Sequence, residues 1–83
     1  MNKIELNHAI SSRILELTES KDISIHELAR RAEVRQSTIN NILNEGKIPT
    51  LSTLINIAKG LNISVLELLD TPEINKKQPA TIK

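Results

Sequence analysis

The sequence predicts an all-α fold, with a compact domain of five helices over residues 1–70 and a polar, flexible tail over residues 71–83. Apolar residues recur at intervals of three and four along most of the chain, which places them on one face of successive helices. No segment alternates apolar and polar residues in the way that marks a half-buried strand. The connections between the predicted helices are only about three to seven residues long, as in compact helical domains.

The first two helices are predicted from apolar spacing and from a capping sequence. The first runs to about Ser20, and its inward face is formed by four apolar residues: Leu6, Ile10, Ile14 and Leu17. Residues 21–23 interrupt this pattern. Ser24 and Glu27 then stand in the S-x-x-E arrangement of a capping box, so a second helix begins there. It is short, because a new polar stretch follows Ala32.

Three further helices follow. Residues 36–44 form the third, and Gly46 lies just beyond it, where a left-handed cap residue is expected. Thr50 caps a fourth helix that ends near Gly60, and a second capping box begins a short fifth helix over residues 64–70. Since the second and third helices are separated by only about three residues, they should cross at a large angle, as in a helix-turn-helix.

The composition excludes several classes of function. The chain has no Cys and no aromatic residue. There is therefore no disulfide, thiolate metal site or cysteine nucleophile, and no stacking platform for single-stranded nucleic acid. No paired-acid, glycine-rich or metal-ligand motif is apparent, so we expect no enzyme, cofactor or metal. The lack of a signal peptide or of a membrane-length apolar run predicts a cytoplasmic protein with no membrane partner.

Residues 10–70 resemble the Xre-type, phage-repressor-like (lambda, 434 and Cro) helix-turn-helix domain. The resemblance rests on the runs SIHELARRA (24–32) and VRQSTINNI (34–42), on Gly46 and Pro49, and on LNISVLELL (61–69). It implies a lambda-repressor-like fold and a sequence-specific regulator of transcription, a repressor, that binds double-stranded DNA. Such proteins bind palindromic operators as dimers, with the second helix of the motif in the major groove.

The outward face of the third helix is the candidate DNA-reading surface. Once Ile39, Ile42 and Leu43 face inward, its outward side chains are neutral hydrogen-bonding groups. Gln and Asn can bond bidentately to adenine in the major groove. By resemblance, Gln36, Ser37 and Asn41 read base edges, and the DNA backbone is contacted by Arg35, Thr38, Asn40, Asn44 and Lys47. The alternative is an ordinary solvated polar face.

Three positions depart from the family pattern. Ile25 stands where the family usually has a Gln that braces the recognition helix, and Glu33 stands where it usually has Gly. A left-handed backbone at Glu33 would cost about 1 kcal/mol. Its carboxylate would also oppose DNA unless Arg31 or Arg35 pairs with it. Arg35 replaces the usual Ser or Thr cap. His8 and His26 are interpreted as surface residues.

Ile63, Leu66 and Leu69 are the candidate dimer residues implied by the resemblance, and the alternative is that they belong to the core. The net charge of only +1 keeps a second function open. In that alternative, the same fold is a protein-binding module, an antitoxin or anti-repressor partner, with DNA binding secondary. From the length of the chain we expect no small-molecule effector domain.

Overall fold

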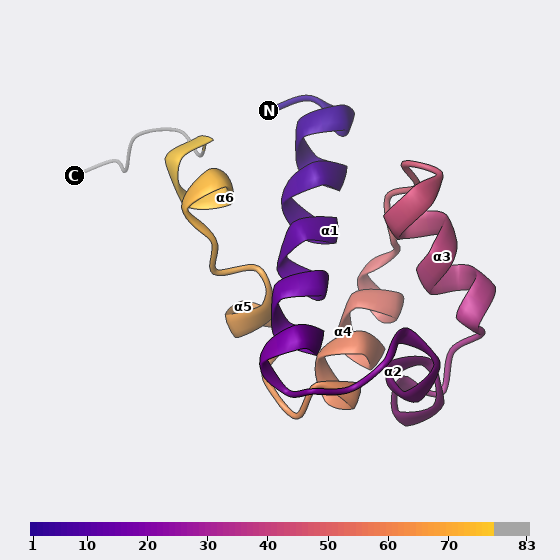
Figure 1. The fold of residues 1–83 in the computed structure, drawn as a ribbon. Helices are drawn as coiled ribbons and strands as arrows, with labels where there is room; N and C mark the ends of the chain where they lie inside the picture. The colour runs from indigo at the N-terminus through magenta and orange to yellow at the C-terminus, as the bar shows by residue number, and fades with distance from the viewer. Residues whose placement is uncertain (78–83) are drawn as a thin grey trace.

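Six α-helices make up the computed structural model, which describes residues 1–77. They are α1 (Lys3–Ser20), α2 (Ile25–Ala32), α3 (Gln36–Asn44), α4 (Leu51–Gly60), α5 (Val65–Leu68) and α6 (Pro72–Lys77). No strand occurs in this part of the chain, so the all-α prediction is confirmed. The long helix α1 stands between two groups of helices, with α5 and α6 on one side and α2, α3 and α4 on the other (Figure 1).

Side-chain caps explain where the helices begin. Ser24, Thr50 and Ser64 each accept a hydrogen bond from a backbone N–H in the first turn, of α2, α4 and α5 respectively. Helix α1 begins earlier than the apolar pattern indicated. A full capping box causes this, because Asn2 Oδ1 accepts from the Glu5 N–H at 2.8 Å and Glu5 Oε1 accepts from the Asn2 N–H at 3.1 Å.

The core is built from branched aliphatic and alanine side chains. Leu28, Ile42, Leu54 and Leu61 are all buried in one cluster. Helices α2 and α4 approach each other closely at Gly60. A Cβ atom at this position would lie 2.9 Å from the backbone nitrogen of Ala32. Glycine is therefore required there by the packing of two helices.

The prediction of a tail beginning at residue 71 was wrong for residues 72–77, which form α6 against α1. Pro72 suits the first position of a helix, where no N–H is needed. Thr71 Oγ1 accepts from the Ile74 N–H at 3.2 Å and caps the helix. Asn75 Nδ2 donates to Asp70 Oδ1 at 2.8 Å. The fold thus has six helices where five were predicted. The rest of the predicted tail, residues 78–83, lies outside the described residues.

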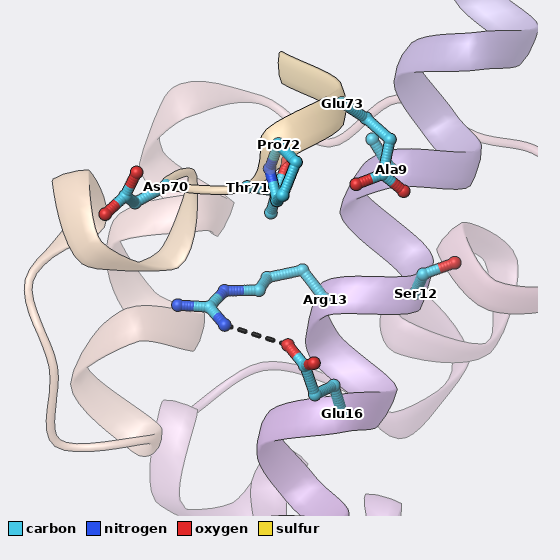
Figure 2. Close-up of a pocket in the computed structure, with 8 residues that line it drawn as sticks. All are labelled: Ala9, Ser12, Arg13, Glu16, Asp70, Thr71, Pro72 and Glu73. Atoms are coloured by element: carbon cyan, nitrogen blue, oxygen red, sulfur yellow. Dashed lines mark hydrogen bonds and ion pairs between the residues drawn. The ribbon is translucent and has the colours of Figure 1, made fainter. Parts of the chain in front are cut away.

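Arg13 joins α1 to the end of α5. Its Nη2 donates to the Glu67 carbonyl at 2.9 Å, and its Nε donates to the Leu68 carbonyl at 3.3 Å. Its Nη1 also pairs with Glu16 at 2.8 Å. Figure 2 shows this residue at one side of a small pocket between α1 and the 70–73 segment. Because the guanidinium already binds two carbonyls and a carboxylate, we infer that Arg13 has a structural role and holds α5 against α1.

Candidate nucleic-acid interface

Helices α2 and α3 form the predicted helix-turn-helix. Three residues separate them, and Figure 1 shows α2 nearly along its axis while α3 runs across the view. Glu33 ends α2 in the left-handed conformation (φ 58°, ψ 39°). This is the conformation expected at a position where the family usually has Gly. The Val34 N–H donates to the Ala29 carbonyl at 3.1 Å, and the Val34 side chain packs against the core. The turn is therefore held by both a backbone hydrogen bond and apolar contact.

The face of α3 that turns away from the core is polar and uncharged. Ile39 and Ile42 are buried, and Leu43 packs partly against the core. The predicted contact residues on α3 divide into two sets by exposure. The exposed ones are Gln36, Ser37, Asn40 and Asn44, and the half-buried ones are Thr38 and Asn41. Arg35, which precedes α3, and Lys47, which follows it, are also exposed. Hydrogen-bonding groups are thus presented along the whole helix.

A pocket of about 230 Å³ lies between α3 and the start of α4. Three of the predicted contact residues, Thr38, Asn41 and Lys47, line it together, and the rest of the lining is Ile42, Ile48, Pro49, Thr50 and Thr53. Gln36, Ser37 and Arg35 lie outside this pocket, at the beginning of α3. The structure therefore groups Thr38, Asn41 and Lys47 at one pocket and leaves Gln36 and Ser37 outside it.

The chain leaves α3 through a tight turn. Gly46 adopts φ 74°, the left-handed conformation predicted for a residue just beyond this helix. The N–H groups of Glu45 and Lys47 both donate to the Asn41 carbonyl at 3.1 Å. Lys47 is thereby fixed close to the last turn of α3.

Two polar side chains of α1 hold this end of α3, and sequence reasoning missed them. Asn7 Nδ2 donates to the carbonyls of Ile42, at 2.9 Å, and Lys47, at 2.8 Å. Ser11 Oγ also donates to the Ile42 carbonyl, at 3.0 Å. The available signal was their spacing of four residues, which places both on the inward side of a helix otherwise lined by apolar residues. We call Asn7 and Ser11 the α1 clamp.

A second missed contact joins α2 to the beginning of α3. His26 Nδ1 lies 3.2 Å from Gln36 Oε1. Ile25, which stands at the family's bracing position, turns partly into the core. The next residue, His26, is exposed and bonds to the recognition helix. The sequence interpretation of His26 as a simple surface residue was therefore incomplete, because it is exposed and also bonded to a predicted base-reading side chain.

The two arginines of α2 both form ion pairs with one carboxylate. Glu27 pairs with Arg30, and its Oε2 lies 2.8 Å from Arg31 Nε. Hydrogen bonds from Arg30, and then from Arg31, lower the pKa of Glu27 from its ordinary 4.5 to about 2. Arg31 therefore pairs with Glu27 and not with Glu33. Within residues 1–77, Arg35 and Lys47 form no ion pair, which leaves their charges to face solvent.

The three candidate dimer residues differ in their surroundings. Ile63 and Leu69 pack partly against the core, as the alternative interpretation held. Leu66 is 79% exposed. It lines a shallow surface pocket together with Leu69 and Ile74. The structure thus brings Leu66 and Leu69 together on one surface, next to α6. None of the helices within residues 1–77 is long and apolar enough to cross a membrane.

Comparison with known proteins agrees with this geometry. Residues 14–68 match the model of a helix-turn-helix family. Over 61 residues the chain is 36% identical to the SPbeta prophage-derived uncharacterized HTH-type transcriptional regulator YopO of Bacillus subtilis (strain 168). This alignment covers 74% of the chain and 87% of the relative. With the six-helix fold and the turn between α2 and α3, these matches show that the chain belongs to the helix-turn-helix family of the Xre and phage-repressor type.

Proposed function

We propose that this protein is a sequence-specific double-stranded DNA-binding regulator of transcription, and that it acts as a repressor. The observation that carries the proposal is the exposed face of α3, which is lined by uncharged amide and hydroxyl side chains within a helix-turn-helix. In this family's docking geometry, the second helix lies in the major groove and the first crosses the backbone. Here those helices are α3 and α2.

Base reading is assigned to Gln36, Ser37 and Asn41. The first two lie at the start of α3 and are exposed, and residues at the start of a recognition helix contact base edges. Asn41 lies one turn further along and is half-buried beside Lys47. Amide side chains discriminate between bases because they donate and accept at fixed positions.

Backbone binding is assigned to Arg35, Thr38, Asn40, Asn44 and Lys47. The two cations have no ion pair within residues 1–77, so binding phosphate breaks no described ion pair of theirs. Thr38 and Lys47 line the same pocket, where a hydroxyl and an ammonium group can share one phosphate. Because the chain carries a net charge of only +1, few phosphate contacts are expected and the salt dependence should be modest.

A dimer on DNA is the second part of the proposal. Two copies on a palindromic site would place their recognition helices about 34 Å apart, one turn of the duplex. The surface of Leu66 and Leu69 is the candidate contact, with Ile63 supporting it from the core side. The exposed leucine and the half-buried apolar residues beside it provide apolar surface area. A second copy of the chain would bury this area, and its removal from water would stabilise the dimer.

Repression requires only that the bound protein occupies a promoter, and it needs neither catalysis nor a cofactor. A protein with this role acts in the cytoplasm, where the promoter lies. The relative from Bacillus subtilis is itself named as a transcriptional regulator. The proposal transfers that role to this chain.

Selection of bound duplexes from a random DNA pool, followed by mass measurement of the complex, tests the proposal. We expect an enriched palindromic motif, two protein chains per duplex, and lower expression from a promoter that overlaps the motif. Leu66→Lys should reduce the complex to one chain per duplex. If no sequence is enriched at low salt and the chain is instead retained by another protein, the protein-binding alternative replaces this function.

A further inference from the structure

We propose that His26 determines which end of the Gln36 side-chain amide faces the DNA, so that base preference at this position depends on the protonation of His26. The inference rests on the proposed function, since it requires α3 to read DNA. The observation that carries it is the 3.2 Å contact between His26 Nδ1 and Gln36 Oε1. Both side chains are exposed, and they come from the two helices of the motif.

The donor and acceptor chemistry of the contact defines the orientation of the amide. A carboxamide oxygen accepts hydrogen bonds and cannot donate one, so His26 Nδ1 must carry the hydrogen. This is the case in the imidazolium and in one neutral tautomer. With Oε1 held by His26, the amino group of Gln36 points away from His26 and is available to the groove.

Loss of the Nδ1 hydrogen reverses this arrangement. In the other neutral tautomer Nδ1 is an acceptor, so the Gln36 amide must turn and donate to it. The amide oxygen is then available to the groove. An amino group suits the acceptors of guanine (N7 and O6), thymine (O4) and adenine (N7), whereas an amide oxygen suits only the amino groups of adenine and cytosine. Low pH, where the imidazolium can only donate, should therefore favour guanine or thymine at this position. At higher pH both neutral tautomers are available, so the amide can take either orientation and this preference should weaken.

The experiment works between about pH 5 and 8, the range in which imidazole side chains change charge. On α2, Glu27 remains ionised, because its pKa is lowered to about 2 by the arginines beside it. Helix α3 carries no titratable residue. The other charged groups on the elements around His26 are Lys21 and Asp22 before α2, Arg30 and Arg31 on α2, Glu33 and Arg35 in the turn, and Lys59 on α4.

Protonation of His26 has a second effect that the experiment must separate. An added positive charge near the backbone strengthens binding to every duplex alike. It leaves the ratio of affinities for two bases at one position unchanged. The ratio is therefore the quantity that reports the orientation of the amide.

The experiment uses four duplexes that carry the selected motif and differ at one base pair. This base pair is the one at which the Gln36→Ala variant no longer prefers one base over the others. Affinities are measured at about pH 5.5 and pH 8. For the natural chain, we expect the guanine-to-adenine affinity ratio to change about fivefold or more between the two pH values, the lower end of what one good amide contact discriminates.

Three variants make the test specific. His26→Ala should remove the pH dependence of the ratio. His26→Asn places an amide that can donate near the position of Nδ1 and does not titrate, so it should keep the low-pH preference at both pH values. His8→Ala is the matched control, because His8 is also exposed but lies on α1. It should leave the pH dependence intact.

The contact itself can be tested without DNA by ¹⁵N NMR of the imidazole ring. Gln36→Ala should move the His26 Nδ1 signal, while the His8 signals stay in place. An unmoved His26 signal overturns the proposal. An enriched motif with a pH-independent ratio, or a ratio that still changes in His26→Ala, overturns it and leaves the proposed function standing. If no motif is enriched at either pH, both proposals fall.

Discussion

Replacement of Glu33 by glycine should stabilise the protein. Glu33 holds φ 58° and ψ 39° at the end of α2, and its N–H donates to the Ala29 and Arg30 carbonyls. A left-handed backbone costs an L-residue about 1–2 kcal/mol, because its Cβ crowds the following carbonyl oxygen. Glycine has no Cβ and keeps both hydrogen bonds. Glu33→Gly therefore removes the strain without changing the turn.

The net gain is smaller than the strain removed. Glycine also gives the unfolded chain more freedom, which costs about 0.4–1 kcal/mol. Taken at the middle of both ranges, the difference is a gain of about 0.5–1 kcal/mol. For a domain of this size, that raises the melting temperature by about 2–8 °C.

Thermal unfolding followed by circular dichroism measures the effect, and Glu33→Ala is the matched control. Alanine removes the same carboxylate but retains the Cβ, so the backbone strain stays. Glu33→Gly should melt above both the natural chain and Glu33→Ala. If the glycine variant melts no higher than the alanine variant, the left-handed strain at this turn is refuted. Any gain in DNA affinity from losing the carboxylate should be equal in the two variants.

Three further predictions follow from the packing and the charges. Gly60→Ala should destabilise the fold by about 1–3 kcal/mol in urea unfolding, because its Cβ would lie 2.9 Å from the Ala32 nitrogen and the two helices would have to separate. Asn7→Ala should cost about 1–3 kcal/mol in the same assay, because the Lys47 carbonyl loses its Asn7 donor and the Ile42 carbonyl keeps only Ser11, and it should weaken binding to the selected duplex. The pKa of Glu27 is lowered from 4.5 to about 2, so its ion pairs stabilise the fold fully above pH 4.5 and are lost as the pH falls toward 2. Between these pH values, the stability of Glu27→Gln should depend less on pH than the stability of the natural chain. Added salt should reduce this difference between the two proteins.

Each of these has an outcome that would contradict it. Alanine usually stabilises a helix relative to glycine, so a stabilised Gly60→Ala would show that α2 and α4 are not in tight contact. Equal DNA affinity for Asn7→Ala and the natural chain would show that the α1 clamp does not position α3. An acid-unfolding curve unchanged by Glu27→Gln would remove Glu27 as a source of acid sensitivity.

The helices that form the core were predictable because their signals are local. The signals are the apolar spacing and the residues that begin or end helices. Each acts within one or two helical turns, and the residues are Ser24, Thr50, Ser64 and Gly46. Helix α6 was missed because Pro72 fits both a break and a first helical position. Thr71, one residue earlier, caps the helix and distinguishes the two.

The candidate site was only partly predictable. The polar face of α3 follows from the inward position of Ile39 and Ile42, which the apolar spacing indicated. The supports of that face join distant parts of the chain. His26 lies 10 residues from Gln36, and Asn7 lies 35 residues from Ile42. No local pattern specifies such contacts, since they depend on how the helices pack.

The central claim is that α3 reads DNA bases, and the affinity of Gln36→Ala for single-base variants of the selected duplex tests it most directly. We predict that Gln36→Ala loses about 1–3 kcal/mol of binding free energy on the selected duplex. On duplexes that already differ at the base pair read by Gln36, it should lose almost nothing. The variant should therefore lose its base preference at that one position and keep it at the others. Lys47→Ala is the comparison, because loss of a phosphate contact should weaken binding to all duplexes alike and reduce the salt dependence. If Gln36→Ala instead weakens every duplex equally, or none, α3 is not the reading helix.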